Sequence, residues 1–393
     1  MREVVIVGAV RTAIGNFQGG LSGFTATELG GLVIVEALKR AGVGPDQVDE
    51  VIMGNVLPHG LGQNPARQAV LKAALPYDVG AITVNKVCGS GLKAVMLAAQ
   101  AVACGDAEVV VAGGMEVMSQ APYLLPKART GYRMGHGEMW DAMIRDGLWD
   151  VNNDFHMGYT ADLVAEKFGV SREEQDAYAF RSYERALASV QSGRFDAERM
   201  PVMIPQKKGE ALAFLDDEAA RPSPLEKLAS LRAVFKKDGT VTAANASKIS
   251  DGAAALVVVS RVYAEKHGLR VLGRVGAQAS AGIEPHDVLV APIKAIPKVL
   301  KKAGLSRGDI DLYEINEAFA SSTLAVMKEL ELSEDRVNVN GGAIALGHPI
   351  GASGARVLVT LLSALEQRGL RRGLATLCLG GGEAVALIVE RAG

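Results

Sequence analysis

Two stretches of the sequence, 262 residues apart, carry the same helix-turn-strand pattern. Residues 38–42 (LKRAG) match residues 300–304 (LKKAG), and at the same offset residues 48–49 fall on residues 310–311 without a gap. Self-similarity of this kind is typical of two related structural units in one chain. We therefore predict a duplicated fold, although two helix-turn-strand segments of similar composition would produce the same match.

The pattern along the rest of the chain agrees with such a duplication. Residues 89–91 and the helix after them resemble residues 352–354 and their helix at an offset of 263. Short β-branched runs that end in glycine predict strands at 4–8, 51–54, 108–114, 254–260, 311–316 and 374–380. The stretches between them predict helices at 27–40, 91–103, 293–302 and 354–367. This alternation favours parallel sheets covered by helices.

Residues 121–249 have no counterpart in either half. They contain both tryptophans, Trp140 and Trp149, a charged helix predicted at 171–192, and polar loops with prolines. Loops on a rigid scaffold often carry function, so we expect an inserted lid or substrate-binding domain. The predicted organisation is an N-terminal half at 1–120 plus 250–270, an inserted domain at 121–249, and a C-terminal half at 271–393.

Composition limits the classes of function. The 393 residues are 49% apolar and 22% charged with a net charge of −2, which gives no electrostatic reason to expect nucleic-acid binding. The sequence opens on a strand pattern rather than a signal peptide, and no apolar run is expected to reach the roughly 18 residues that span a bilayer. Three cysteines do not make a disulfide framework. We expect a cytoplasmic protein that binds neither membrane nor nucleic acid.

Cys88 lies in a glycine-rich turn between a strand predicted at 81–87 and a helix that begins near Gly91. The positive end of a helix dipole should lower the pKa of such a thiol from its free value of roughly 8.5. The same turn offers backbone N–H groups to an oxyanion. We interpret Cys88 as a nucleophile, with a buried structural cysteine as the alternative.

The glycines around Cys88 also resemble a dinucleotide-binding fingerprint, Gly89-x-Gly91-x-x-Ala94. That motif requires an acidic residue about 20 positions on, after the next strand. Asp106 and Glu108 stand instead where the next strand begins. We therefore reject this interpretation.

Three further polar residues stand in small-residue surroundings or at strand ends. His348 lies in the glycine-rich stretch 341–354 without the HxxH pattern or carboxylates of a metal site, which favours an imidazole facing a cavity. Cys378 precedes three glycines, and a second thiol suggests a separate proton-transfer role. Asn316 could hold a water or a carbonyl, or simply cap a helix at 317–330. Cys104 is interpreted as a packing residue at a helix end.

Four motifs, at residues 87–91, 316–319, 341–354 and 378–382, resemble the thiolase family in order and spacing. The resemblance covers essentially the whole chain and is strongest to the acetyl-CoA acetyltransferase (acetoacetyl-CoA thiolase) branch. It implies an α/β fold of duplicated βαβαβαββ halves that form a layered α-β-α-β-α core with an inserted loop domain. It also implies a homo-oligomer, a dimer of dimers, and a place in fatty acid metabolism.

The resemblance implies a ping-pong Claisen condensation of two acetyl-CoA to acetoacetyl-CoA and CoA, with CoA thioesters as substrates and no cofactor or metal. Cys88 would carry the acyl group, and His348 would be its base and an oxyanion donor. Cys378 would remove the α-proton. Asn316, through a water, would help to hold the enolate, and the Gly380 and Cys88 backbone N–H groups would form a second oxyanion hole.

The resemblance also implies a set of CoA-contacting residues in this chain: His156, Met157, Arg221, Ala243, Ser247 and Phe319. His156 and Met157 would line the pantetheine and acyl pocket, as in short-chain members. For Arg221 the alternative is an arginine in a solvated loop.

The sequence departs from the family pattern at several positions. Lys248 stands where glycine is usual, residues 288–291 (VLVA) replace a glycine-rich segment, and Ala233 and Ala384 replace a proline and a glycine. The first two departures keep a degradative 3-ketoacyl-CoA thiolase for longer chains as the alternative function. A ketoacyl synthase is expected to have histidine at the position of Cys378, and a non-catalytic relative is expected to have lost a thiol.

Overall fold

The two halves of the chain build sheets with the same strand order. The computed structural model describes residues 1–221 and 224–391. In the N-terminal half the order is β4 (Gly80–Val84), β3 (Glu50–Gly54), β5 (Val109–Val117), β13 (Ser250–Ser260) and β1 (Val4–Thr12). In the C-terminal half it is β15 (Leu312–Ile315), β16 (Arg372–Leu379), β17 (Glu383–Arg391) and β14 (Gly273–Gly282). A bridge from Tyr313 to Val337 takes the place of a fifth strand.

The sheets are mixed, which corrects the expectation of parallel sheets. β13 runs antiparallel to both of its neighbours, β5 and β1, and β17 runs antiparallel to β16 and β14. The other strands of each half share one direction. In the C-terminal half the reversal follows from a tight glycine hairpin between β16 and β17, which returns the chain at once to the neighbouring position. β1 and β14 join the halves through a pairing of two residues.

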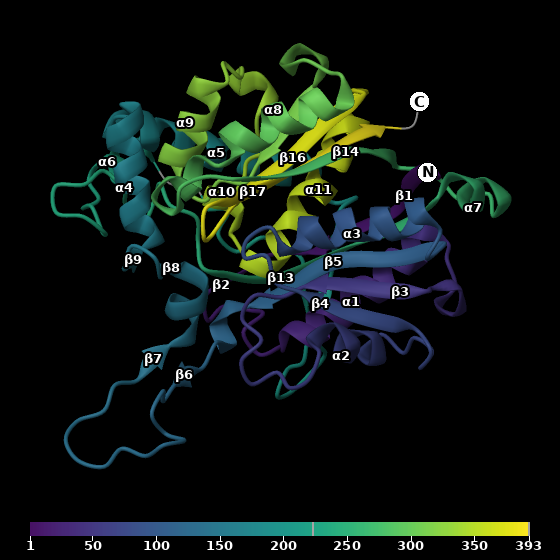
Figure 1. The fold of residues 1–393 in the computed structure, drawn as a ribbon, viewed down its shortest axis with the longest axis horizontal. Helices are drawn as coiled ribbons and strands as arrows, with labels where there is room; N and C mark the ends of the chain where they lie inside the picture. Colours follow the sequence, from purple (N-terminus) through teal and green to yellow (C-terminus); the bar gives the residue numbers. More distant parts are fainter. Residues whose placement is uncertain (222–223, 392–393) are drawn as a thin grey trace.

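The helices complete five layers (Figure 1). α3 (Ser90–Cys104) and α11 (Ile350–Gln367) lie between the two half-sheets, in contact with strands of both. α1 (Ala26–Ala41) and α2 (Pro65–Lys72) cover the outer face of the N-terminal half, and α8 (Pro292–Ala303) covers that of the C-terminal half, with α9 (Ala320–Glu329) beside it. The duplicated α-β-α-β-α core is thus confirmed.

The repeated LKxAG motif ends the two outer helices in the same way. Gly42 after α1 and Gly304 after α8 both have φ of 68° and cap their helices with backbone N–H groups. Glycine adopts this left-handed conformation without the penalty that a Cβ brings. At its other end α1 begins in a capping box formed by Thr25 and Glu28. Local sequence therefore fixes where these helices begin and end.

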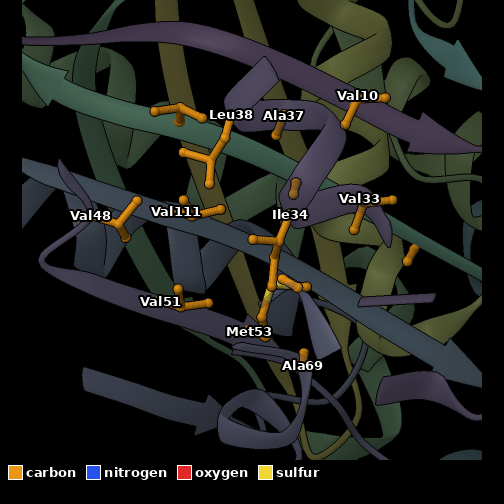
Figure 2. Packing of buried hydrophobic residues seen from close by; sticks show 14 of the residues in the cluster. Val10, Val33, Ile34, Ala37, Leu38, Val48, Val51, Met53, Ala69 and Val111 are labelled. Carbon is orange, nitrogen blue, oxygen red and sulfur yellow. The ribbon is translucent and has the colours of Figure 1, made fainter. Parts of the chain in front are cut away.

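The apolar face of α1 packs on the N-terminal half-sheet. Ile34 and Leu38 of α1 belong to the same buried apolar cluster as Met53 of β3 and Val111 of β5 (Figure 2). Each of these four side chains is at most 4% exposed. Full burial of such a side chain contributes about 1.5–3 kcal/mol, so this layer is a main source of stability for the half.

Glycines allow α3 and α11 to cross at very short range. A Cβ on Gly91 would lie 2.7 Å from the backbone nitrogen of Ala355, and one on Gly354 would lie 2.3 Å from that of Leu92. These two glycines are equivalent in the internal repeat. Because backbone atoms cannot move aside, only glycine permits this contact, and it brings the N-termini of both helices together.

The segment 121–249 contributes helices and long loops beside the core. Its helices are α4 (Met157–Phe168), α5 (Arg172–Gln191) and α6 (Leu225–Ala229). Between β6 (Tyr123–Leu124) and β7 (Trp140–Asp141) the chain extends away from the body of the molecule (Figure 1). The remaining elements are short: β2 (Gly15–Asn16), β8 (Trp149–Asp150), β9 (Phe155–His156), β10 (Arg199–Met200), β11 (Val202–Ile204), β12 (Leu212–Phe214), α7 (Arg261–Lys266) and α10 (Ala343–Leu346).

One apolar stretch is longer than the sequence led us to expect. Among the described residues, Val87–Cys104 has the length and composition of a membrane span, with a mean hydropathy of 1.5, and 56% of it is buried in the fold. This corrects the expectation that no apolar run reaches that length. The stretch contains α3, whose apolar character reflects its position between the two half-sheets.

We predict that Gly354→Ala destabilises the protein by about 1–3 kcal/mol or more, because the new methyl group meets the backbone of α3. The measurement is the midpoint of urea unfolding, with Gly23→Ala as the control, since a Cβ there meets nothing within 4 Å. Equal midpoints for the two variants would show that the helices do not cross as closely as described.

Candidate active site

One cavity of about 460 Å³ collects side chains from both halves and from the segment 121–249. Nine of the eleven residues proposed from the sequence line it: Cys88, His348, Cys378, Gly380, His156, Met157, Ala243, Ser247 and Phe319. Asn316 lies just behind its wall, and Arg221 lies elsewhere. The rest of the lining is largely apolar, as is usual for a small-molecule site.

Cys88 sits in a strained turn between β4 and α3. Val87, just before it, has φ of +47°, a conformation that a β-branched residue rarely adopts. Ser90 holds the turn, because its Oγ accepts a hydrogen bond from the backbone N–H of Lys86 (2.8 Å) and donates to the carbonyl of Val87 (2.6 Å). The strand-turn-helix arrangement exposes the Cys88 thiol to the cavity, as in a nucleophile elbow.

The expectation that the helix dipole lowers the pKa of Cys88 is wrong. Burial raises the pKa of the thiol to about 12, although hydrogen bonds from the backbone N–H groups of Cys88 and Gly380 oppose part of the rise. Removal from water disfavours the thiolate more strongly than the helix end favours it. Cys88 is therefore a thiol in the free protein, and it needs a base to become a nucleophile.

His348 is buried and held in one tautomer. Its Nδ1 lies 2.6 Å from Ser353 Oγ, which in turn donates to the carbonyl of Pro349 at 2.9 Å. Since the serine proton is used there, Nδ1 carries the imidazole proton and Nε2 presents a lone pair. Burial and the positive charge of Arg356 lower the pKa of His348 to about 3. The imidazole is neutral at physiological pH and can accept a proton at Nε2.

Asn316 follows β15 and places its Nδ2 3.4 Å from His348 Nε2. The alternative role as a helix cap is wrong, because α9 begins at Ala320 with Phe319 at the capping position. The side chain is buried behind the cavity. Asn316 and His348 thus form one polar pair at the end of the C-terminal half-sheet.

Cys378 is the second-last residue of β16, next to the glycine hairpin. Its thiol is buried in the cavity wall, and burial together with the nearby Cys88 raises its pKa well above the usual range. Gly381 and Gly382 follow with φ of +88° and +93°, which only glycine adopts easily. The hairpin turns the backbone N–H of Gly380 toward the Cys88 sulfur. Two protonated thiols and one neutral imidazole therefore share the cavity.

An aromatic wall closes one side of the cavity. His156 caps the N-terminus of α4, and its Nδ1 accepts a hydrogen bond from the backbone N–H of Gly158 at 3.0 Å. Its ring stacks on Phe235 with centroids 4.8 Å apart, and Phe235 meets Phe319 edge-on at 6.3 Å. The sequence analysis missed Phe235. Its signal was an aromatic residue in a polar loop of a chain with only 5% aromatic residues.

The segment with Ser247 packs against the chain between β15 and α9. Ala246 pairs with Phe319 in an antiparallel bridge, and the Ser247 backbone N–H donates to the carbonyl of Ala318 at 3.0 Å. This pairing places Ser247 and Phe319 on the same face of the cavity. Ala243, at the start of the segment, is exposed.

Residues from two departures from the family pattern, at Lys248 and within residues 288–291, lie in the cavity lining. Lys248 is the one side chain with a fixed charge among the described lining residues, and its Nζ donates to the carbonyls of Ala243 and Ala246. Burial lowers the pKa of Lys248 to about 8. Val288 and Leu289 also line the cavity. These residues narrow and charge a region where glycine would leave space.

The structure places two residues differently from what the sequence predicted. Arg221 is exposed and donates to the carbonyl of Glu218 at 3.1 Å, away from the cavity. Cys104 ends α3 as expected but is exposed, so it is not a packing residue. Within residues 1–221 and 224–391, no group of three or more His, Cys, Asp or Glu side chains is placed to hold a metal ion.

Comparison with known proteins agrees with this geometry. The family model for the thiolase N-terminal domain matches residues 4–262, and that for the thiolase C-terminal domain matches residues 269–391. An acetyl-CoA acetyltransferase of Pseudomonas aeruginosa is 57% identical, and one of Cupriavidus necator is 55% identical. Each of these alignments covers 100% of both chains.

Solved structures are similar over the whole chain as well. The crystal structure of the Bacillus anthracis acetyl-CoA acetyltransferase superposes with a TM-score of 0.98 at 45% identity, covering 100% of this chain and 99% of that one. The acetyl-CoA acetyltransferase of Syntrophomonas wolfei gives 0.97 at 42%, covering 100% of both chains. Matched by two family models that together span nearly all of its length, the chain belongs to the thiolase family.

Proposed function

We propose that this chain is an acetyl-CoA C-acetyltransferase that condenses two acetyl-CoA to acetoacetyl-CoA and CoA, reversibly and through an acetyl group on Cys88. The observation that carries the proposal is the meeting of Cys88, His348 and Cys378 in one cavity. The names of the full-length relatives support the choice of acetyl-CoA as substrate. A condensation needs an acyl carrier and a separate base, because one thiol cannot serve as both at once.

In the first half-reaction Cys88 attacks the thioester carbonyl of acetyl-CoA. Its proton moves to the lone pair of His348 Nε2, where it displaces the long contact from Asn316 Nδ2 at 3.4 Å. The carbonyl oxygen becomes an oxyanion between the backbone N–H groups of Cys88 and Gly380. The C–S bond to CoA breaks, and the departing sulfur takes a proton from Cys378, whose buried thiol is protonated. The products are free CoA, acetylated Cys88, imidazolium and the Cys378 thiolate.

In the second half-reaction the Cys378 thiolate removes an α-proton from another acetyl-CoA. The enolate oxygen then lies against the Nε2–H of His348 and, through a water, the amide of Asn316. The α-carbon attacks the acetyl carbonyl on Cys88, and the C–S bond to Cys88 breaks. Cys88 recovers its proton from His348, so both thiols and the imidazole return to their starting states.

CoA would bind along the aromatic wall. We propose that His156 and Met157 line the pantetheine and acyl region, with Phe319 as an apolar contact, and that Ser247 hydrogen-bonds the pantetheine. Ala243 would add a contact at the rim. The exposed Arg221 would reach the CoA phosphates, which are the strongest anions of the substrate. The proposed steps use side chains, backbone groups and one water, and we expect no cofactor.

A second candidate is a degradative 3-ketoacyl-CoA thiolase for longer acyl chains. The observation that favours it is the apolar pair Val288 and Leu289 in the cavity lining, which could contact an acyl chain. Met157 lines the same cavity and occupies space that a longer chain would need. We therefore rank the acetyl-specific reaction first.

We further propose a cytoplasmic homotetramer, a dimer of dimers, that acts in fatty acid metabolism. Two surfaces support an assembly. β4 is the unpaired edge of its sheet, and Ile82 on it is 46% exposed. The projecting chain between β6 and β7 carries Met134, which is 98% exposed. Exposed apolar residues on an edge and on an extended loop are typical of protein–protein contacts.

The choice between the two reactions is tested by thiolysis of acetoacetyl-CoA and of straight 3-ketoacyl-CoA substrates with longer chains. We expect kcat/KM to be highest for acetoacetyl-CoA and to fall at least about tenfold with the first two added methylenes, because Met157 blocks the space. A kcat/KM that rises with chain length would favour the degradative thiolase instead.

Alkylation tests the need for a base at Cys88. With a pKa of about 12, Cys88 holds very little thiolate near pH 7, so its reaction with iodoacetamide should depend on His348. We expect His348→Ala to slow labelling of Cys88 at neutral pH, and acetyl-CoA to protect Cys88 in the wild type. Peptide mass spectrometry gives both rates, with the exposed Cys104 as an internal control. Equal Cys88 labelling in variant and wild type would contradict the mechanism.

A further inference from the structure

α11 places a buried arginine directly behind Asn316. Arg356 is 2% exposed, and its Nη2 donates to Asn316 Oδ1 at 3.5 Å. On the opposite face of the asparagine, Nδ2 lies 3.4 Å from His348 Nε2. The three side chains form a line from the interior of the core to the wall of the cavity.

The arginine decides which way the asparagine amide faces. A guanidinium has only donors, so the group that it meets must be the carbonyl oxygen. In the opposite orientation the amide N–H groups would meet Arg356, and the carbonyl would face the lone pair of His348 Nε2. Both contacts would be repulsive. Arg356 therefore keeps the amide N–H directed at the site.

The charge of Arg356 is only weakly compensated. Its nearest carboxylate oxygen belongs to Glu314, 3.7 Å from Nη1, and its Nε and Nη1 have no hydrogen-bond partner in the part of the chain that the structure describes. Arg11, equally buried, is paired with Glu198 at 2.6 Å and Asp217 at 2.7 Å. Burial also raises the pKa of Glu314 to about 8, which weakens this carboxyl as a counter-charge for Arg356 at neutral pH.

We propose that Arg356 is a positioning residue that fixes the Asn316 amide toward the enolate oxygen and places an unneutralised positive charge behind it. The inference rests on the proposed function, since it assigns the pair of Asn316 and His348 to an enolate. Arg356 touches no substrate and acts through Asn316 and through its field. A positive charge in a water-poor interior stabilises a developing oxyanion more than it would in water.

The charge also acts on His348. The other titratable groups on the elements near His348 are Cys88 before α3, Glu116 on β5, Lys248 before β13, Asp251 on β13, Glu314 on β15, Glu317 after β15, and Cys378 on β16. Of the charged groups, Arg356 is the one whose field lowers the pKa of His348. Removal of this cation should raise the pKa of His348. As the pH falls, the imidazole would then become protonated, and lose its function as a base, at a higher pH than in the wild type.

Two substitutions separate orientation from charge. Arg356→Lys keeps a positive charge but cannot present a planar fork to Asn316 Oδ1, and Arg356→Met removes both. The first readout is the exchange of the acetyl-CoA α-protons into deuterated water, which reports enolate formation. The second is the acidic limb of the pH profile of kcat/KM for thiolysis.

We expect Arg356→Lys to slow proton exchange but to leave the acidic limb of the pH profile at its wild-type position. Arg356→Met should slow exchange about 100-fold and also move the limb about one unit to higher pH. Wild-type exchange in Arg356→Lys would overturn the orienting role. An unmoved limb in Arg356→Met would overturn the electrostatic one. No exchange by the wild-type protein would instead contradict the proposed function itself.

Controls address folding. Leu358, on the same helix and fully buried, makes no polar contact, so Leu358→Ala should lower stability without moving the acidic limb. If Leu358→Ala reproduces both changes of Arg356→Met, the effect is general loosening and the proposal fails. If Arg356→Met does not fold, the double variant Arg356→Met, Glu314→Gln removes the buried cation together with the carboxyl that faces it, and it is measured in the same two assays with the same outcomes deciding.

Discussion

The close crossing of α3 and α11 is the constraint on which the site depends. Each helix contributes one glycine, Gly91 or Gly354, where a Cβ would strike the backbone of the other helix. The two N-termini therefore meet at one end of the central layer. The turn before α3 carries Cys88, and the stretch before α11 carries His348. A bulkier residue at either glycine would separate the halves and, with them, the thiol from its base.

The duplicated fold explains how one cavity receives functional groups from two different turns, one in each half. Ser90 and Ser353 are equivalent in the repeat, and each holds the functional turn of its own half, at Cys88 and at His348. Burial keeps both thiols protonated and the imidazole neutral. In every proton transfer of the proposed cycle one of these groups is the donor or the acceptor. Cys378 becomes a strong base only after it has given its proton to the leaving sulfur.

The fold and most of the site could be predicted from sequence, because motifs and caps are local. Gly42 and Gly304 end equivalent helices as their shared motif indicates, and nine of eleven proposed residues line the cavity. The predictions that were wrong or missing concern properties that depend on residues distant in the sequence. The high pKa of Cys88 results from burial by both halves, and the role of Arg356 requires the register between α11 and β15. A local sequence pattern determines neither the direction of a strand in the sheet nor the exposure of Cys104.

The division of labour between the two thiols is the central claim, and acetyl transfer in two variants tests it most directly. Labelled acetyl-CoA is mixed with Cys378→Ser and with Cys88→Ser, and the protein is digested and analysed by mass spectrometry while acetoacetyl-CoA is assayed. The account predicts that Cys378→Ser still acquires acetyl on Cys88, more slowly because the departing sulfur no longer takes its proton from Cys378, but forms almost no acetoacetyl-CoA. It also predicts that Cys88→Ser acquires no acetyl thioester. Acetyl found on Cys378, or loss of acetylation in Cys378→Ser, would contradict it.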